Sequence, residues 1–302
     1  MSREPTMALR LGATTLAVSP ERPLLMGIVN ASPESFSDGG LLPDADARVA
    51  HGLRLAAEGA EIVDVGGESG VTDREPISAR EEVRRMVPVV ERLAAAGVTV
   101  SVDTWKAAVA RAALGAGASM VNDASALRDP GVAAACAEHR AALVVTHTRA
   151  APKVKAFPAY GDVMTDVLEL LAERVRIAER LGVARERIVV DPGLDLAKTP
   201  AQSVELLRRL GELRRLGRPV LLAASRKDFV GALTGRPPAE RLGGTLAAVA
   251  AGADAGAAIL RVHDVAAVAD FLAVRAALQA STTVDAGLHL PRELRRERAE
   301  AA

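Results

Sequence analysis

The stretch VTVSVDTWKAAVARAALGAGASMVND (residues 98–123) decides the fold class of this chain. It opens with a short apolar run at 98–102 and continues as a segment, 106–114, whose apolar residues recur every three to four positions. It ends in a second apolar run at 119–121. A helix between two short, continuous apolar strands predicts a βαβ unit with parallel strands.

The same unit recurs along the whole chain. Apolar runs that we interpret as strands lie at 24–29, 61–65, 98–102, 119–121, 142–146, 188–190, 219–223 and 257–262. Amphipathic stretches at 44–58, 78–95, 106–114, 163–181 and 202–213 predict helices between them. Eight repeats predict a closed (β/α)₈ TIM barrel, because a doubly wound sheet has about five to seven strands and a glycine-rich turn after the first.

We expect a single domain with two short extensions. Residues 1–20 form an N-terminal extension, in which the weak alternation at 8–18 predicts a hairpin that caps the bottom of the barrel. Residues 21–280 form the barrel. Residues 281–302 form a polar C-terminal tail, expected as a surface helix or a frayed end.

The composition excludes several functions. Lys and Arg together number 38, equal to Asp and Glu, and aromatic residues make up 2%. A neutral, aromatic-poor chain argues against nucleic-acid binding. The single cysteine, Cys136, excludes an internal disulfide and is consistent with a reducing cytoplasm. We find no signal peptide and no membrane span, and expect a cytoplasmic protein.

Every predicted strand is followed by polar residues. Alone, each would be a helix cap or a turn residue. Eight such sets at the carboxyl ends of barrel strands meet at one mouth, where barrels carry their active sites. The sets contain Asn30, Asp64, Asp103-Thr104, Asn122-Asp123, His147, Asp191, Ser225-Arg226-Lys227 and Arg261 with His263 and Asp264.

Three of these residues, Asp103, Asn122 and Asp191, suit a planar heterocycle with a donor-rich edge, such as a 2-amino-4-oxo pteridine. Lys227 could donate to a ring carbonyl or nitrogen, and Arg261 could stack on the ring in place of the missing aromatics. Only five of the 38 basic residues are lysines, which favours a point-charge role for Lys227. We expect two of the other lysines, Lys153 and Lys155, on an exposed loop.

A second set suits a polyanion. Asn30, Arg261 and His263 follow the first and last strands, which are neighbours in a closed barrel. They could hold a diphosphate, with Asn30 as an oxygen ligand of Mg²⁺. The loop 31–40 could close over it as a lid. The scattered histidines offer no zinc site.

At these residues the chain resembles the dihydropteroate synthase family, from about residue 20 to 280. The matching motifs are MGIVNASPESFSDGG (26–40), GAEIVDVGGES (59–69), SVDTWKAAVARAALGAGASMVND (101–123), VVDPG (189–193), SRK (225–227) and ERLGGTLAAVAAGA…ILRVHDV (240–265).

The resemblance implies that 6-hydroxymethyl-7,8-dihydropterin diphosphate condenses with p-aminobenzoate, releasing diphosphate in folate biosynthesis. It implies a homodimer through the later helices and a Mg²⁺ cofactor bound at Asn30. Asp103, Lys227 and Asn30 carry the catalytic roles, with Asp103 stabilising a pterin-methyl cation. The family's pterin pocket corresponds to Asp103, Asn122, Asp191, Lys227 and Arg261, and its diphosphate contacts to Asn30, Arg261 and His263.

The chain departs from the family around the second substrate, at Gly70, Asp195, Leu196 and Asp228. Ser69, the last residue of a matching motif, belongs to the same second-substrate region. The family has a serine where Asp228 stands, and an aspartate would repel a carboxylate substrate, at a cost of about 1 kcal/mol in water and more when shielded. Asp228 would alternatively be a plain helix N-cap.

Four functions therefore remain open. The first is synthesis of dihydropteroate with an altered amine site. The second is a pterin-diphosphate-binding paralogue with another nucleophile or without synthase activity. The third is non-catalytic pterin binding, and the fourth is a methyltetrahydrofolate-handling barrel. The diphosphate-binding residues argue against the last two.

Overall fold

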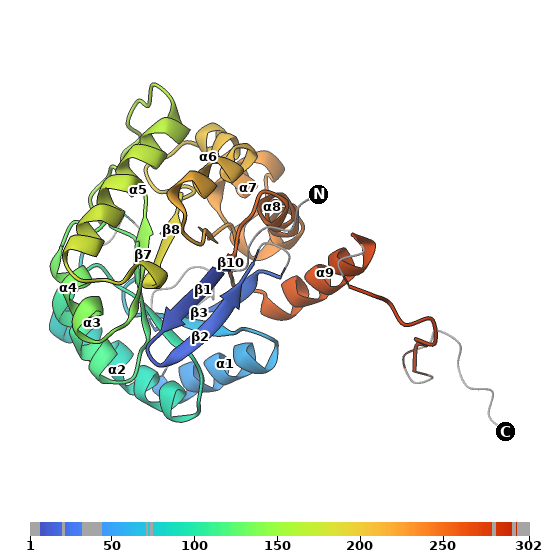
Figure 1. Ribbon diagram of the computed structural model, residues 1–302, viewed down its shortest axis with the longest axis horizontal. Coiled ribbons are helices and arrows are strands. Elements are labelled where there is room, and N and C mark those ends of the chain that lie inside the picture. Colours follow the sequence, from blue (N-terminus) through green and yellow to red (C-terminus); the bar gives the residue numbers. More distant parts are fainter. Residues whose placement is uncertain are drawn as a thin grey trace.

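The barrel closes on itself. The computed structural model describes residues 7–19, 22–31, 44–70, 72, 75–279, 282–291 and 294. Eight parallel strands have the order β8-β7-β6-β5-β4-β3-β10-β9. The two outer strands then meet, because Val190 N donates to Pro219 O over 3.0 Å and Val190 forms a parallel bridge with Val220. Helices surround this ring, so the predicted (β/α)₈ barrel is confirmed (Figure 1).

The barrel strands lie within two residues of the predicted runs. They are β3 (Leu24–Asn30), β4 (Ile62–Gly66), β5 (Val100–Asp103), β6 (Met120–Asp123), β7 (Ala142–Thr146), β8 (Ile188–Asp191), β9 (Leu221–Leu222) and β10 (Ile259–Val262).

The helices follow the strands in turn. They are α1 (Ala45–Ala57), α2 (Ala79–Ala95), α3 (Ala107–Gly115), α4 (Gly131–Glu138), α5 (Val163–Arg180), α6 (Pro200–Arg208), α7 (Asp228–Thr234), α8 (Leu242–Asp254) and α9 (Val265–Leu278). Short 3₁₀ helices are η1 (Arg185–Arg187), η2 (Leu210–Leu216) and η3 (Pro238–Glu240). The helix expected at 202–213 is thus two elements, because α6 ends at Arg208 and η2 continues the chain.

Strand alternation divides the barrel interior into an apolar and a polar layer. Every second side chain of a barrel strand points inward. On β4, Ile62 belongs to the apolar layer, whereas Asp64, two residues further, hydrogen-bonds to Arg261. The apolar layer comprises Leu24, Met26, Ile62, Met120, Ala142, Val144, Val189, Leu221, Ala258 and Ile259 from the strands and their edges.

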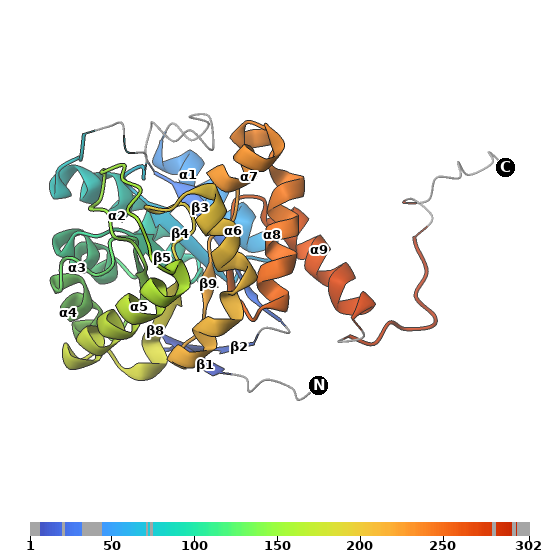
Figure 2. The ribbon, with the colours of Figure 1, turned by 90° about the horizontal axis from the view of Figure 1, so that it is seen from above.

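The N-terminal hairpin closes the barrel below the apolar layer (Figure 2). Strands β1 (Met7–Leu11) and β2 (Thr14–Val18) pair antiparallel, as predicted. Leu9, Leu11 and Val18 are at most 1% exposed and pack into the apolar layer. The guanidinium of Arg187 donates to the carbonyls of Arg10 and Gly12, both over 3.2 Å. The bottom of the barrel is therefore sealed by apolar packing and by hydrogen bonds.

Side-chain caps fix the helix starts that border the mouth. Asp44, Ser78 and Asp162 each accept a hydrogen bond from the backbone N–H three residues further on. Thr199 and Gln202 form a reciprocal capping box at the start of α6. Because each helix starts after a strand-to-helix loop, these caps anchor the loops that surround the site.

The C-terminal segment leaves the barrel after α9 (Figure 1). Residues 282–291 are exposed and contain no helix. The remainder of the expected tail, apart from residue 294, lies outside the described residues. Across the part of the chain that the structure describes, no helix combines the length and apolarity needed to cross a membrane.

Candidate active site

All residues that the sequence assigned to the pterin, diphosphate or second-substrate site line one cavity at the carboxyl ends of the strands. The cavity measures about 370 Å³. The assigned residues around it are Asn30, Ser69, Gly70, Asp103, Asn122, Asp191, Leu196, Lys227, Asp228, Arg261 and His263. The expected lid, residues 31–40, lies outside the described residues except for Ala31. His147 does not line the cavity, because it is fully buried and bonds to Asp166 over 2.7 Å.

A guanidinium shared by two carboxylates forms the floor of the cavity. Arg261 donates from Nε to Asp64 Oδ2 over 2.6 Å and from Nη2 to Asp103 Oδ2 over 2.9 Å. Asn122 donates from Nδ2 to the same Asp64 oxygen over 3.0 Å. The side chain of Asp64 is fully buried. Arg261 is thus held in a fixed orientation by its acidic partners, and stacking of its planar face on a ligand ring stays a prediction.

Burial disfavours the charged forms of Asp103 and Asp191, the two aspartates expected to accept hydrogen bonds from a ligand ring. It raises the pKa of Asp103 to about 7, while the charge of Arg261 opposes that rise and Asp64 reinforces it. Burial also raises the pKa of Asp191, and the Gly193 N–H and the Lys227 ammonium oppose it. A ligand whose N–H groups donate to these carboxylates would favour their ionised forms. The floor is therefore poised to accept hydrogen bonds from a planar, donor-bearing ring.

His263 presents a hydrogen-bond donor at the edge of the cavity. The Ser225 hydroxyl accepts the backbone N–H of His263 over 3.2 Å and lies 3.0 Å from Nδ1. Ser225 can therefore donate to Nδ1, which leaves the ring proton on Nε2. Burial, assisted by Arg226 and Arg261, lowers the pKa of His263 to about 3. This neutral donor lies beside two cationic residues, a combination that suits an anionic group.

A buried lysine shapes the loop between β8 and α6. Lys198 is 1% exposed, and its ammonium donates to the carbonyls of His147, Gly193 and Leu196 over 3.2, 2.8 and 2.9 Å. Burial lowers its pKa to about 7. Gly193 has φ +66°, and a Cβ there would lie 2.0 Å from His147 O, so only glycine fits. The turn that follows Asp191 is therefore set by Lys198 and Gly193 together.

The outer rim is organised by Asp195, which the family comparison of the sequence had marked only as a departure. Asp195 Oδ2 accepts the backbone N–H of Asp228 over 2.5 Å and that of Phe229 over 3.3 Å. Its Oδ1 accepts the Ser203 hydroxyl over 2.9 Å. A carboxylate from the β8–α6 loop thus caps the first turn of α7.

Asp228 does not cap its own helix, so the N-cap interpretation is wrong. The N-cap position belongs to Lys227, and its side chain makes no capping bond. The Asp228 side chain is 88% exposed and accepts from Arg241 Nη1 over 3.0 Å. A carboxylate so exposed and so paired repels another anion weakly, because water and Arg241 screen it.

Sequence reasoning missed Lys198 and Arg241. Asp64 was expected among the polar residues of the mouth but received no role of its own, although strand parity places it two residues after the inward-facing Ile62. Lys198 is one of only five lysines in the chain, and this rarity could have singled it out as a candidate site residue. Arg241 also donates to the Arg226 and Lys227 carbonyls over 2.9 and 3.1 Å, and no local pattern announces these contacts.

The metal prediction rests on Asn30 alone. Among the described residues no three His, Cys, Asp or Glu side chains gather as a group that could hold a metal ion. A single amide oxygen suits a Mg²⁺ ion whose other ligands are phosphate oxygens and water. The residues present thus fit a metal that arrives with an anionic ligand, and do not form a closed protein cage.

Comparisons with known proteins identify relatives along nearly the whole chain. Residues 26–263 match the family described as pterin binding enzyme. The dihydropteroate synthase of Bacillus subtilis is 43% identical over 247 residues, which cover 81% of this chain and 85% of the relative. A Xanthomonas albilineans dihydropteroate synthase solved with 4-aminobenzoic acid is 45% identical, with a TM-score of 0.84 and coverage of 91% and 99%. The same bacterial enzyme solved with 7,8-dihydropteroate has a TM-score of 0.80, 45% identity and coverage of 90% and 99%.

Lys198 generates a prediction about stability and pH. Its folded pKa, about 7, lies below its ordinary value of 10.5, so between these values the unfolded chain holds the extra proton. Stability should therefore rise with pH from about 7 to 9, by about 1.4 kcal/mol per pH unit at most. We expect Lys198→Met to lose that rise and to cost about 2–4 kcal/mol at pH 9, because buried carbonyls lose the donors of the neutral Lys198 amine.

Urea unfolding between pH 6 and 9 measures both effects. The exposed Lys155→Met serves as the control and should keep the wild-type slope. Equal pH slopes in wild type and Lys198→Met would show that Lys198 stays charged throughout.

Proposed function

This chain belongs to the dihydropteroate synthases of the pterin binding enzyme family, and we propose which part of the synthase reaction each of its site residues serves. The chain is a transferase of folate biosynthesis that condenses 6-hydroxymethyl-7,8-dihydropterin diphosphate with p-aminobenzoate and releases diphosphate. This assignment of roles rests on how deep each residue lies in the cavity. Strand residues form its floor, and loop residues form its rim.

The floor takes the pterin ring. Asp103 and Asp191 accept the N–H groups of the ring edge, and Asn122 both donates and accepts. The Asn122 amide is oriented by Asp64, and the Asp103 carboxylate by Arg261. The Lys227 carbonyl accepts hydrogen bonds, but its ammonium pairs with no other described residue, and it donates to a ring acceptor. A ring without matching donors would leave buried carboxylates unsatisfied, which supports selectivity for pterins.

The diphosphate lies over Asn30, Arg261 and His263, on the adjacent strands β3 and β10. The Nε2–H of His263 and the guanidinium donate to phosphate oxygens. Asn30 would supply one oxygen ligand to a Mg²⁺ ion, which would neutralise charge on the leaving diphosphate when bound. As the bond from the pterin methylene carbon to the diphosphate oxygen breaks, the Asp103 carboxylate stabilises the cationic ring. The arylamine nitrogen then bonds to that carbon and loses one N–H proton to the released diphosphate or to water.

The rim takes p-aminobenzoate. Ser69, Gly70 and Leu196 surround the outer part of the cavity, with Asp228 and Arg241 at its edge. The relative from Xanthomonas albilineans, solved with 4-aminobenzoic acid, supports this second substrate. Arg241 offsets the charge of Asp228, so a carboxylate substrate can approach. The free, buried thiol of Cys136 is consistent with our proposal of a cytoplasmic location.

A homodimer through the later helices is also part of the proposal. Helix α9 buries only Val265 and Val268, although its sequence is almost entirely apolar. Val274 and Leu278, one turn apart on α9, are 60% and 82% exposed. A second copy of the chain would cover this apolar face.

The condensation is tested by incubating the protein with the pterin diphosphate, Mg²⁺ and p-aminobenzoate. We expect dihydropteroate and diphosphate to appear in equal amounts. Asn122→Ala should raise the KM for the pterin diphosphate by about 10–100-fold, because the ring loses a polar partner in a buried site. Its KM for p-aminobenzoate should change little.

The control is Gln279→Ala, which removes an amide near the end of α9. Release of diphosphate without dihydropteroate would assign a different acceptor to the rim. An unchanged KM for the pterin diphosphate in Asn122→Ala would contradict the assigned floor.

Asp228→Ser should lower the KM for p-aminobenzoate by about two- to fivefold, which is the range of an exposed charge interaction. The gain should shrink at high salt, because an exposed carboxylate is screened. Steady-state kinetics at low and high ionic strength measure both effects. A gain that is much larger and independent of salt would place Asp228 in a shielded position.

Val274→Glu should convert the dimer to a monomer, because a charge cannot be buried unpaired in an apolar interface. Light scattering over a range of protein concentrations gives the mass. Leu53→Glu, on the half-exposed face of α1, is the matched control and should remain a dimer. A monomeric wild type would refute the proposed assembly.

A further inference from the structure

Four charged side chains form a nearly buried cluster behind the rim, which we call the loop clamp: Glu68, Glu82, Lys106 and Lys153. Lys106 Nζ donates to Glu68 Oε2 over 2.6 Å and to Glu82 Oε2 over 2.7 Å. Lys153 Nζ lies 3.5 Å from Glu68 Oε1 and donates to the carbonyl of Ser69. The side chains of Glu68, Glu82 and Lys153 are 2%, 1% and 7% exposed. Two acids and two bases make the cluster neutral, as burial requires.

The Lys153 side chain is therefore buried, so the expectation that it is exposed is wrong. The loop itself is exposed, as at Val154 and Lys155. Lys153 also has φ +65°, a backbone conformation that costs a residue with a side chain about 1 kcal/mol or more. The long β7–α5 loop thus bends sharply where it brings this ammonium to Ser69, 84 residues earlier in the chain.

The clamp joins loops that the barrel alone would leave separate. Glu68 lies in the loop between β4 and α2, and it also accepts the Ile77 N–H over 3.2 Å. Lys106 is the N-cap residue of α3 and donates to the Ile77 carbonyl over 2.7 Å. Lys153 comes from the loop after β7. Three loops are therefore fixed relative to one another by two ammonium groups.

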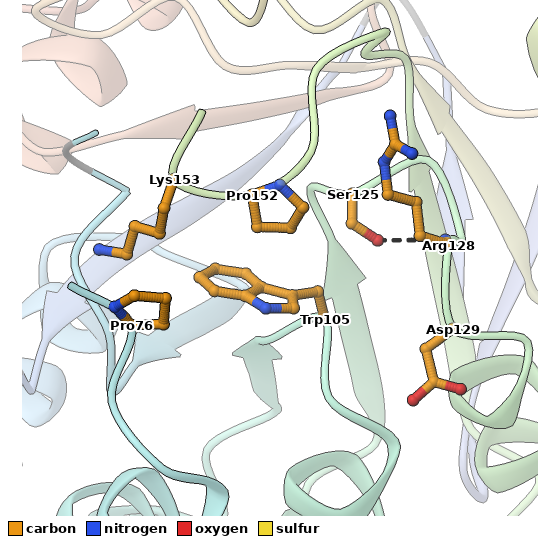
Figure 3. Close-up of a pocket in the computed structure, with 7 residues that line it drawn as sticks. All are labelled: Pro76, Trp105, Ser125, Arg128, Asp129, Pro152 and Lys153. Atoms are coloured by element: carbon orange, nitrogen blue, oxygen red, sulfur yellow. Dashed lines mark hydrogen bonds between the residues drawn. The ribbon is translucent and has the colours of Figure 1, made fainter. Parts of the chain in front are cut away.

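Trp105 is the apolar half of the same junction. Its indole lies between Pro76 of the β4–α2 loop and Pro152 of the β7–α5 loop, with the Lys153 stem alongside (Figure 3). These residues line a hollow of about 350 Å³ beside the main cavity, and Trp105 lines both. The junction forms a wall between the two spaces, and Ser69 and Gly70 lie on the cavity side of this wall.

We propose that Lys153 is a positioning residue for the second-substrate half of the site: from outside the cavity it fixes Ser69 and Gly70 at the rim. The proposal rests on our assignment of p-aminobenzoate to the rim. Lys153 is not among the residues that line the main cavity. Its removal should therefore disturb the rim and leave the pterin floor intact. A lysine suits this task, because its compact ammonium can reach Ser69 O and Glu68 at once.

Kinetics of Lys153→Met against Lys155→Met test the proposal, because the two lysines lie on one loop and differ in burial. We expect Lys153→Met to raise the KM for p-aminobenzoate about tenfold, since small displacements of positioning groups have large effects. The KM for the pterin diphosphate should stay within about twofold. Lys153→Gln, which keeps a donor for Ser69 but loses the charge, should fall between Lys153→Met and wild type. Lys155→Met should match the wild type.

Hydrogen exchange without substrates gives a readout that is independent of activity. Lys153→Met should accelerate exchange in the peptides that contain Glu68 to Gly70 and Ile77, and leave those of β5 and β6 unchanged. If the wild type makes no dihydropteroate but this local acceleration is found, the proposed function fails and the positioning role stands. A parallel rise of both KM values, or exchange that is unchanged or accelerated throughout the barrel, would overturn the proposal.

Discussion

The site depends on one guanidinium that is shared by two carboxylates inside the barrel. Arg261 from β10 reaches Asp64 on β4 and Asp103 on β5, with β3 between β10 and β4. When both carboxylates are ionised, the single cation leaves the group one negative charge in excess, which is costly in a protein interior. The Oδ1 atom of Asp64 has no hydrogen-bond partner within the described structure. The protein holds this unfavourable arrangement because the surrounding strands are rigid, and a ligand rich in N–H donors relieves it.

The rigidity of the strands comes from the apolar layer of the barrel interior, below the site. Strand alternation sets three of the polar floor residues two positions after an inward apolar residue: Ile62 precedes Asp64, Met120 precedes Asn122, and Ile259 precedes Arg261. A shift of register by one residue would turn the whole polar set outward. The dense apolar layer and the hairpin resist such a shift, so the packing that stabilises the fold also fixes the chemistry at the mouth.

Much of the fold and of the site could be predicted from the sequence, because the periodicities of helices and of strands are patterns of neighbouring residues. Eight apolar runs predicted eight strands, and the polar residues after them meet around one cavity. The errors concern contacts between loops. Nothing near Lys153 in the chain indicates that its ammonium bonds to Ser69, and nothing near Asp195 indicates that its carboxylate caps α7. Such contacts depend on how long loops fold against one another, and a single sequence has no periodic signal for that arrangement.

The hairpin beneath the barrel limits the routes by which ligands can enter and leave the site. With Leu9, Leu11 and Val18 filling the base, the cavity has no second exit on that side. On our proposed assignment, the ring that rests on the strand residues would have to enter before the molecule that rests on the loops. The joined product would span both levels and would have to leave through the mouth before the next ring could bind. The closed base of the barrel, far from any reacting atom, would thereby impose an order on binding and release.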